Sequence, residues 1–374
     1  MILVLEPNSR PDGGDYRMLA AQLERLPNVT FRVHREVGSE VTLTEIYLIG
    51  NTAALTVEQM QVLPCVAKVV RVSEPYRVLG RHKQGDDRPA SFDYNGVRFG
   101  QDSVNVFAGL CAVDSRDSVE GMMRALRDHG QVCTRMGAYK PRTSPYAFQG
   151  FGDECLPYVF ELAGKYGIRV IAMEITHESH VDEIRDALAA TGNATGVMLQ
   201  IGTRNTQNFE LLKLVGKQQE FPVLIKRGFG ITLDESLNAA EYLATEGNRK
   251  VVFCLRGMKT NMGDPHRNFV DFSHVPVVKR LTRMPVAIDP SHSVGTRARA
   301  PDGLLDIFHV VAQGVIAGAD MVLVDFHPDP ARALVDGPQA LLLSELRPFL
   351  DDVQLARECY EKRTKLARES AAAG

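Results

Sequence analysis

Short, continuous runs of apolar residues recur along the chain from about residue 104 onward. They start about 31 residues apart on average, and amphipathic stretches such as 118–130 and 232–247 lie between them. The eight runs cover residues 104–111, 131–138, 167–174, 195–201, 222–227, 250–255, 284–289 and 319–325. Continuous apolar strands that alternate with helices are typical of buried parallel sheets. Eight such units in about 225 residues predict a closed (β/α)₈ TIM barrel, with an open doubly wound sheet as the alternative.

The first 75 residues follow a different pattern. Runs typical of strands cover residues 2–6, 29–37, 41–50 and 66–72. Apolar residues at helical spacing around 16–26 and 57–63 predict two helices between these strands. The resulting order, βαββαβ, is that of a small α+β ferredoxin-like domain.

Residues 76–103 predict a linker between the two parts. The segment 82–91 is polar and contains glycine and proline, so we expect a loop there. Asn95-Gly96 stands between two short alternating runs, which is a hairpin signal. The expected organisation is a ferredoxin-like domain at 1–75, a linker with a β-hairpin at 76–103, and a catalytic barrel with a C-terminal helix at 104–374.

Composition narrows the class of protein. Apolar residues make up 44% and charged residues 24% of the chain, and the net charge is −3. These are ordinary globular values that give no reason to expect nucleic acid or a membrane surface as partner. No apolar run approaches 18 residues, and the first residues lack the pattern of a signal peptide. Six scattered cysteines without a C-x-x-C pair fit a reducing compartment, so we expect a cytoplasmic protein.

Cationic side chains end several of the predicted barrel strands or follow them closely. They are Arg135, Lys140, Arg142, Arg204, Lys226, Arg227 and Arg256. In such barrels the functional groups gather at the carboxyl-terminal face, so these cations should meet at one opening. Converging cations require an anionic ligand, and Arg and Lys commonly hold phosphate. Their number suits two phosphates and a carboxylate. The alternative for any single residue is a surface loop position without a ligand.

A second group follows strands one, seven and eight, which become neighbours when a barrel closes. It consists of Cys111, His292, Asp325 and Asp336. One thiolate, one imidazole and two carboxylates suit a divalent transition metal such as Mn²⁺, Fe²⁺, Co²⁺ or Zn²⁺. Taken one by one, the cysteine could be a core residue, the histidine a loop residue and the aspartates helix caps.

Four stretches of the chain carry a specific resemblance. They are GAYKPRTSPYAFQGFG at 137–152, LQIGTRNTQNFELLK at 199–213, LIKRG at 224–228 and IDPSH at 288–292. With these motifs the chain resembles the type I 3-deoxy-D-arabino-heptulosonate 7-phosphate (DAHP) synthases, in particular the subgroup with an N-terminal ferredoxin-like domain. The KPRTS motif is informative because the sister synthases of eight- and nine-carbon sugar acids carry a different sequence there.

The resemblance implies a role for each matching residue. Arg135, Lys140, Arg204, Lys226 and Arg256 would bind phosphoenolpyruvate, and Arg142, Thr143 and Ser144 would hold the phosphate end of erythrose 4-phosphate. Cys111, His292, Asp325 and Asp336 would be the metal ligands. The implied reaction joins the two substrates and water to give DAHP and phosphate, the first step of the shikimate pathway to aromatic amino acids. In it the metal acts as a Lewis acid on the aldehyde.

Three residues are the catalytic candidates. Lys140 is the expected general acid toward the new alkoxide, and crowding by arginines predicts a lowered pKa for it. Glu174 could orient the attacking water, or it could simply balance the nearby cations. His292 is expected to act through the metal.

Three positions depart from the family pattern. Leu110 stands where a proline is usual before the cysteine, Asp325 where a glutamate is usual, and Leu255 where the closest subgroup has glutamate. They keep two alternatives open. One is a divergent synthase that uses another aldose phosphate in a specialised pathway. The other is a non-catalytic relative that binds a regulatory ligand or a partner enzyme.

Within the family the N-terminal domain senses aromatic amino acids. His34 matches a position of that inhibitor pocket, so the resemblance implies a regulatory or oligomer-stabilising domain with a possible aromatic amino acid effector. It also implies a homo-oligomer, either a tetramer or a dimer.

Overall fold

A computed structural model describes residues 1–7, 9–37, 41–52, 55–71, 76–81 and 89–372. The chain divides into two compact units, Met1–Arg77 and Val78–Gly374. Most of the loop expected at 82–91 lies outside the described residues.

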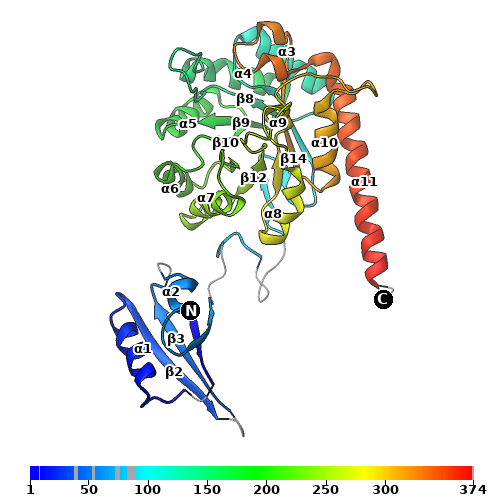
Figure 1. Ribbon diagram of the computed structural model, residues 1–374. Helices are drawn as coiled ribbons and strands as arrows, with labels where there is room; N and C mark the ends of the chain where they lie inside the picture. Colours follow the sequence, from blue (N-terminus) through cyan, green and yellow to red (C-terminus); the bar gives the residue numbers. More distant parts are fainter. Residues whose placement is uncertain (8, 38–40, 53–54, 72–75, 82–88, 373–374) are drawn as a thin grey trace. The chain divides into compact units, whose positions relative to one another are not determined.

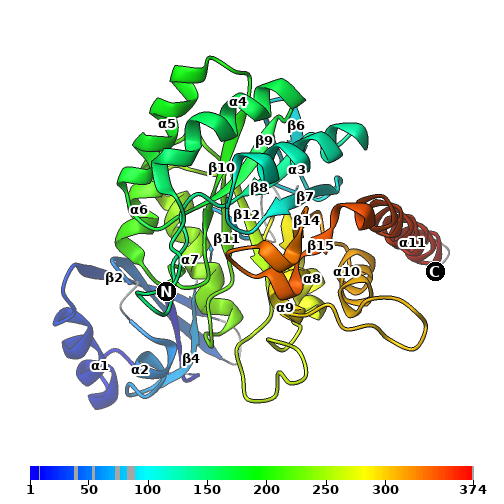
Figure 2. The same cartoon turned by 90° about the horizontal axis from the view of Figure 1, so that it is seen from above.

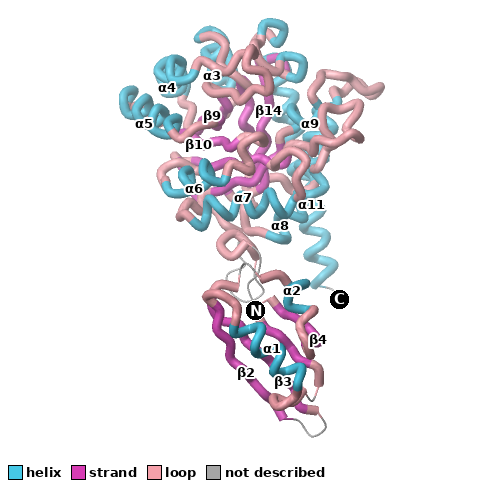
Figure 3. Tube along the Cα trace, turned by 60° about the vertical axis from the view of Figure 1, so that its left-hand side comes forward, coloured by secondary structure: helices cyan, strands magenta, loops and turns pink. Residues whose placement is uncertain are grey.

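The N-terminal unit is a four-stranded antiparallel sheet with two helices on one face (Figure 3). Its elements are β1 (Ile2–Leu5), α1 (Gly14–Glu24), β2 (Val29–Val37), β3 (Thr42–Gly50), α2 (Val57–Gln61) and β4 (Val66–Val70). The strand order β2-β3-β1-β4 is that of a ferredoxin-like fold, as predicted. Leu19 and Leu23 of α1 and Met60 of α2 pack with Leu3 and Ile46 of the sheet, because period-2 and period-3.6 apolar positions meet on that face.

The second unit contains the predicted closed barrel. Its parallel strands are β7 (Asn105–Leu110), β8 (Cys133–Met136), β9 (Val170–Ile175), β10 (Gly196–Ile201), β11 (Val223–Lys226), β12 (Val251–Leu255), β13 (Val286–Ile288) and β14 (Met321–His327). All eight coincide with predicted apolar runs. Met321 pairs with Ala287 on one side and with Asn105 on the other, which closes the ring and excludes an open sheet.

Helices surround the strands (Figures 1 and 2). They are α3 (Arg116–Asp128), α4 (Leu156–Tyr166), α5 (Ser179–Thr191), α6 (Phe209–Lys217), α7 (Leu233–Thr245), α8 (Val275–Leu281), α9 (Pro290–Val294), α10 (Asp306–Ile316) and α11 (Leu346–Ala372). Local signals set their ends. Thr232 and Glu235 form a capping box at the start of α7, and Gly167 ends α4 in the left-handed conformation. Among the described residues, no helix is long and apolar enough to cross a membrane.

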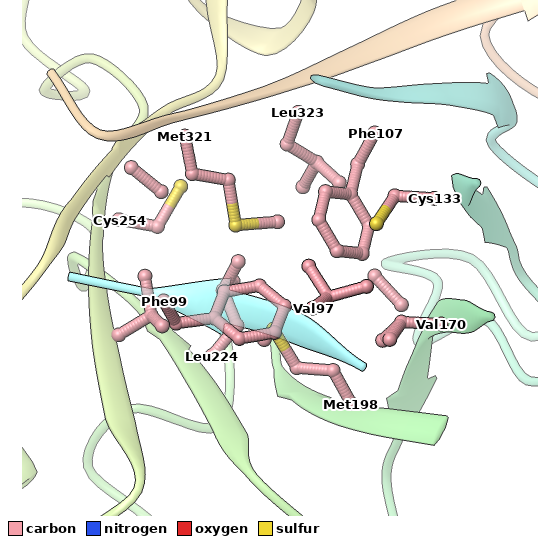
Figure 4. Packing of buried hydrophobic residues seen from close by; sticks show 13 residues of the cluster. Val97, Phe99, Phe107, Cys133, Val170, Met198, Leu224, Cys254, Met321 and Leu323 are labelled. Carbon is pink, nitrogen blue, oxygen red and sulfur yellow. The ribbon is translucent and has the colours of Figure 1, made fainter. Parts of the chain in front are cut away.

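A hairpin covers the amino-terminal end of the barrel. It is formed by β5 (Phe92–Tyr94) and β6 (Val97–Phe99), and Asn95-Gly96 between them has positive φ at both residues, as a type I′ turn requires. Val97 and Phe99 pack with Phe107, Met198 and Leu224 from the strands, as Figure 4 shows. The hairpin is therefore part of the barrel core rather than a free spacer. Because hydrocarbon fills this end, the opposite end is left for chemistry.

Candidate active site

A pocket of about 250 Å³ opens at the carboxyl ends of the strands. The predicted site residues that line it are Lys140, Arg142, Thr143, Ser144, Glu174, Arg204, Lys226, Arg256, His292 and Asp336. Arg135, Cys111 and Asp325 are buried beside these residues and contact them. Every barrel residue proposed from the sequence except Arg227 thus belongs to one connected group.

Four potential metal ligands lie together at the base of the pocket. One donor atom from each of Cys111, His292, Asp325 and Asp336 lies within 4.8 Å of all the others. Cys111 Sγ is 3.1 Å from Asp336 Oδ2 and 3.6 Å from His292 Nε2. A thiolate, an imidazole and two carboxylates at this spacing can surround one divalent transition metal ion.

The Asp289-Pro290-Ser291-His292 sequence positions the histidine. Asp289 caps α9 by accepting a hydrogen bond from the backbone N–H of His292, and Pro290 occupies the first helical position, where its fixed φ suits the helix. The Asp289 carboxylate also lies 3.0 Å from His292 Nδ1, which leaves Nε2 for the cluster. Ser291 Oγ accepts from the backbone N–H of Asp325, so the same turn is joined to β14.

The carboxylates of the cluster are fixed by residues that sequence reasoning had partly missed. Asp325 Oδ1 accepts from Arg135 at 2.5 Å, and Oδ2 accepts from Gln339 at 2.5 Å. Arg267 donates to both Asp336 Oδ1 and Gln339 Oε1. The shorter Asp325 side chain is therefore held by two donors. Gln339 and Arg267 lie in long loops well beyond the ends of the predicted strands, and only the folded chain brings them here.

Two backbone features present the remaining ligands. Asp336 adopts φ 56°, a left-handed conformation that aspartate tolerates better than most residues. Leu110, which replaces the usual proline, is buried, and its carbonyl accepts from the N–H of Gly137, while the Gly137 carbonyl accepts from Val113. These bonds tie both sides of Cys111 to the neighbouring strand, so the loop is ordered without the proline.

The cluster is electrostatically negative. Burial disfavours a charged imidazole, but Asp289, Asp325 and Cys111 outweigh this effect and raise the pKa of His292 to about 10. Burial also opposes charge on Asp336, yet contact with His292 and Lys140 lowers the pKa of that carboxyl. Such surroundings favour a bound cation.

Lys140 lies at the junction between this cluster and the cationic part of the pocket. Its Nζ is 3.1 Å from Cys111 Sγ and 3.6 Å from Glu174 Oε2. The expectation of a lowered pKa is wrong. Burial acts in that direction, but Cys111 and Glu174 exceed it and raise the pKa of Lys140. The arginines are close to Lys140 in the sequence, whereas the Cys111 thiol and the Glu174 carboxylate come from other strands and become neighbours only in the fold.

Glu174 is set at the pocket wall by its neighbours. Gln200 donates to Glu174 Oε2 at 3.3 Å. A Cβ atom at position 202 would lie 1.9 Å from Glu174 Oε1, so Gly202 leaves room for the carboxylate in this position. Glu174 is 8% exposed, which leaves it within reach of a ligand in the pocket.

The cationic part of the pocket is drawn from several strands. Lys226 Nζ donates to Asp289 at 2.5 Å, and Arg204 donates to Thr143 Oγ1 at 3.3 Å. Arg256 is 2% exposed, and its Nε and Nη1 atoms have no hydrogen-bond partner within the described part of the chain. Unsatisfied buried donors of this kind are suited to an anion.

Arg227 does not belong to this group, although the sequence suggested it. Its Nη1 atom contacts Asp271 at 3.0 Å and His274 at 2.9 Å, and it does not line the pocket. Side chains alternate in direction at the end of a strand, so adjacent Lys226 and Arg227 point to opposite sides.

His34 lies in the other unit, on the sheet face opposite the two helices. It lines a hollow of about 470 Å³ with Met1, Arg32, Tyr47 and Ile49. The His34 and Tyr47 rings meet edge to face with centroids 6.4 Å apart. Aromatic and apolar walls with adjacent polar groups can accept a small amphipathic ligand.

Comparisons with known proteins agree on one family. Residues 81–360 match the model of the DAHP synthetase I family. The chain is 35% identical to phospho-2-dehydro-3-deoxyheptonate aldolase of Thermotoga maritima over 98% of both chains. The crystal structure of that enzyme aligns with a TM-score of 0.74 at 32% identity, covering 96% of each chain. A 2-dehydro-3-deoxyphosphooctonate aldolase of Acidithiobacillus ferrooxidans is 29% identical over 67% of this chain and 88% of its own.

Proposed function

The chain belongs to the DAHP synthetase I family, and we propose that its pocket holds a divalent metal beside two phosphorylated substrates. The enzyme is a DAHP synthase, a transferase that forms a C–C bond in an aldol-type reaction. It condenses phosphoenolpyruvate with erythrose 4-phosphate and water to give DAHP and phosphate, the first step of the shikimate pathway. The observation that supports the proposed site most strongly is the continuity between the donor cluster and the cationic pocket, with Lys140 touching both.

The metal would be held by Cys111, His292, Asp325 and Asp336. Their close spacing, and the Asp289 contact that leaves His292 Nε2 free, support this assignment. When bound, a divalent ion would supply Lewis-acid polarisation of the aldehyde oxygen. Mn²⁺, Fe²⁺, Co²⁺ and Zn²⁺ all suit the donor set, and metal analysis of the purified protein would select among them.

The substrates would be distributed along the cationic wall. Arg135, Lys140, Arg204, Lys226 and Arg256 would hold the phosphate and carboxylate of phosphoenolpyruvate. Arg142, Thr143 and Ser144, which are exposed at the mouth, would hold the phosphate of erythrose 4-phosphate. This order places the aldehyde end near Lys140 and the cluster. Holding both reactants in one orientation removes much of the entropic cost of joining them.

Side chains of the pocket would then guide each bond change. C3 of phosphoenolpyruvate attacks the aldehyde carbon, and the former aldehyde oxygen takes a proton from the Lys140 ammonium. The raised pKa of Lys140 keeps this proton in place at neutral pH. Water, oriented by Glu174, adds to C2 and gives a proton to the Lys140 amine, which restores its ammonium form. The bond between C2 and the phosphate oxygen of the resulting phosphohemiketal then breaks, the C2 hydroxyl becomes the keto group of DAHP, and its proton leaves with inorganic phosphate.

A phosphate-release assay tests this proposal. Release from phosphoenolpyruvate should require erythrose 4-phosphate, stop when the metal is removed by a chelator, and resume when Mn²⁺ or Co²⁺ is added. Unchanged turnover of fully metal-free protein would rule out the Lewis-acid role. Faster turnover with a five-carbon aldose phosphate would instead support a divergent substrate, which Asp325 and Leu110 leave as the second candidate.

We further propose that the N-terminal unit binds an aromatic amino acid and regulates a homo-oligomer. The aromatic hollow around His34 supports this role. Titrating phenylalanine, tyrosine and tryptophan against wild type and His34→Ala should give inhibition by at least one of them, weakened in the variant. Light scattering would identify a tetramer or a dimer. Equal inhibition of both proteins would remove His34 from the effector site.

A further inference from the structure

One aromatic ring lies among three cations beside the pocket. The Arg256 guanidinium lies 4.7 Å from the centroid of the Phe229 ring, the Arg204 guanidinium 5.5 Å and the Lys259 ammonium 5.8 Å. Within the described residues no carboxylate forms an ion pair with any of these three. Like charges gathered at a partly buried site repel, so something must compensate for the lost hydration of Arg256.

The loop that carries Phe229 is fixed to the loops of both arginines. Phe229 stands between Gly228 and Gly230 after β11, and Gly230 has φ 62°, which favours glycine. On one side, Thr203 Oγ1 donates to the Arg227 carbonyl and Thr206 Oγ1 to the Lys226 carbonyl, each at 2.7 Å. These bonds join the Arg204 loop to the Phe229 loop.

The Arg256 loop is attached from the other side. Asp271 accepts a hydrogen bond from the N–H of Gly257 at 2.8 Å and one from Arg227 at 3.0 Å. Arg227, which faces away from the pocket, thus connects the loop after β12 to the one after β11. Hydrogen bonds thus fix the Phe229 loop to the loops of both arginines, and none of these bonds uses an N–H group of Arg204 or Arg256.

We propose that Phe229 is a positioning residue that holds Arg256 and Arg204 through cation–π contacts, so that their N–H groups remain available for the acidic groups of phosphoenolpyruvate. This rests on the proposed function. The physical reason is the direction of the interaction. A ring attracts a guanidinium through its face, whereas a carboxylate would occupy the N–H donors and compete with the substrate. Burial lowers the pKa of Arg256, consistent with a cation that lacks a full counter-ion.

Stepwise fluorination of the ring tests the proposal in the full-length enzyme. Fluorine withdraws the negative potential of the ring face and leaves its shape nearly unchanged. Replacing Phe229 by 4-fluoro-, 3,5-difluoro- and pentafluorophenylalanine should raise the Kd and KM for phosphoenolpyruvate progressively, by about 10-fold at the end of the series. The kcat should stay within about twofold, because the ring does not touch the reacting atoms.

A matched control is available in Phe209, which stacks on Tyr242 at 4.9 Å and does not line the pocket. Fluorination there should leave the KM for phosphoenolpyruvate unchanged. Phe229→Leu should raise the same constant about 10-fold or more, and Phe229→Tyr should retain most of the affinity. A flat fluorine series in an enzyme that still makes DAHP would overturn the role of Phe229 alone. Absence of any turnover in wild type would overturn the proposed function instead.

Discussion

The barrel interior is apolar at one end and charged at the other, although the same eight strands build both. At the amino-terminal end, Phe99 and Val97 from the hairpin pack on Phe107 and Met321, and all four side chains are buried. At the carboxyl end, buried charges contact one another and surround a pocket. The apolar end can stabilise the barrel, but it has no polar groups with which to bind an ionic ligand. The charged end can hold ionic ligands because the apolar end supplies the stability that buried charge removes.

Two cysteines allow the charged and the apolar ends to be compared at the same residue type. Cys111 lies 3.1 Å from Lys140 and close to Arg135, whereas Cys133 is in the apolar cluster, where burial raises its pKa to about 12. Cys111→Ala should abolish metal retention and reduce turnover by at least about 100-fold, because a thiolate ligand is lost. Metal content and phosphate release measure both effects.

Cys133→Ala is the matched control for that prediction. It should keep the metal and the turnover per folded molecule, and it should cost only about 1 kcal/mol of stability, since a small buried side chain is shortened. A Cys111→Ala protein that retains full metal and activity would contradict the assigned ligand.

The hairpin should matter for stability alone. Phe99 is 1% exposed, and Phe99→Ala should lower the free energy of unfolding by about 3–5 kcal/mol through the cavity it leaves. Phe99→Leu should cost less because it fills more of the space. Denaturant unfolding measures the loss, and metal affinity at low temperature should not change. A large loss of metal affinity in well-folded Phe99→Leu would mean that the two ends are not independent.

The buried carboxyl of Asp320, which directly precedes β14 and is not part of the apolar cluster, offers a smaller, pH-dependent effect. Asp320 contacts Lys279 at 2.7 Å, and burial raises its pKa to about 6. The folded state therefore binds more protons than the unfolded state between about pH 4 and pH 6, so Asp320 lowers stability as pH rises through that window. The difference in unfolding free energy between wild type and Asp320→Asn should shift by on the order of 3 kcal/mol from pH 4 to pH 7. A pH-independent difference would refute this reading.

The sequence predicts the barrel well because a strand buried on both faces leaves a continuous apolar run. The sequence predicts the hairpin but not its position in the barrel core. Strands of three residues are too short to indicate that the eight barrel strands pack around them. In the site, the cations and the four potential metal ligands could be predicted because they follow the carboxyl ends of predicted strands. The pattern could not reveal Gln339, Arg267 or Phe229, whose roles depend on loop contacts. The predicted direction of the Lys140 pKa shift was wrong for the same reason, because Cys111 and Glu174, which raise this pKa, are distant in sequence.

The proposed metal ion and the acidic substrate would share one pocket. Phosphorus-31 relaxation of phosphoenolpyruvate alone, with Mn²⁺ added to metal-stripped enzyme, measures their proximity without turnover. Wild type should accelerate the relaxation strongly, and Cys111→Ala, which should not retain Mn²⁺, should not. Phosphoenolpyruvate that binds wild type with Mn²⁺ present and shows no such acceleration would contradict the account.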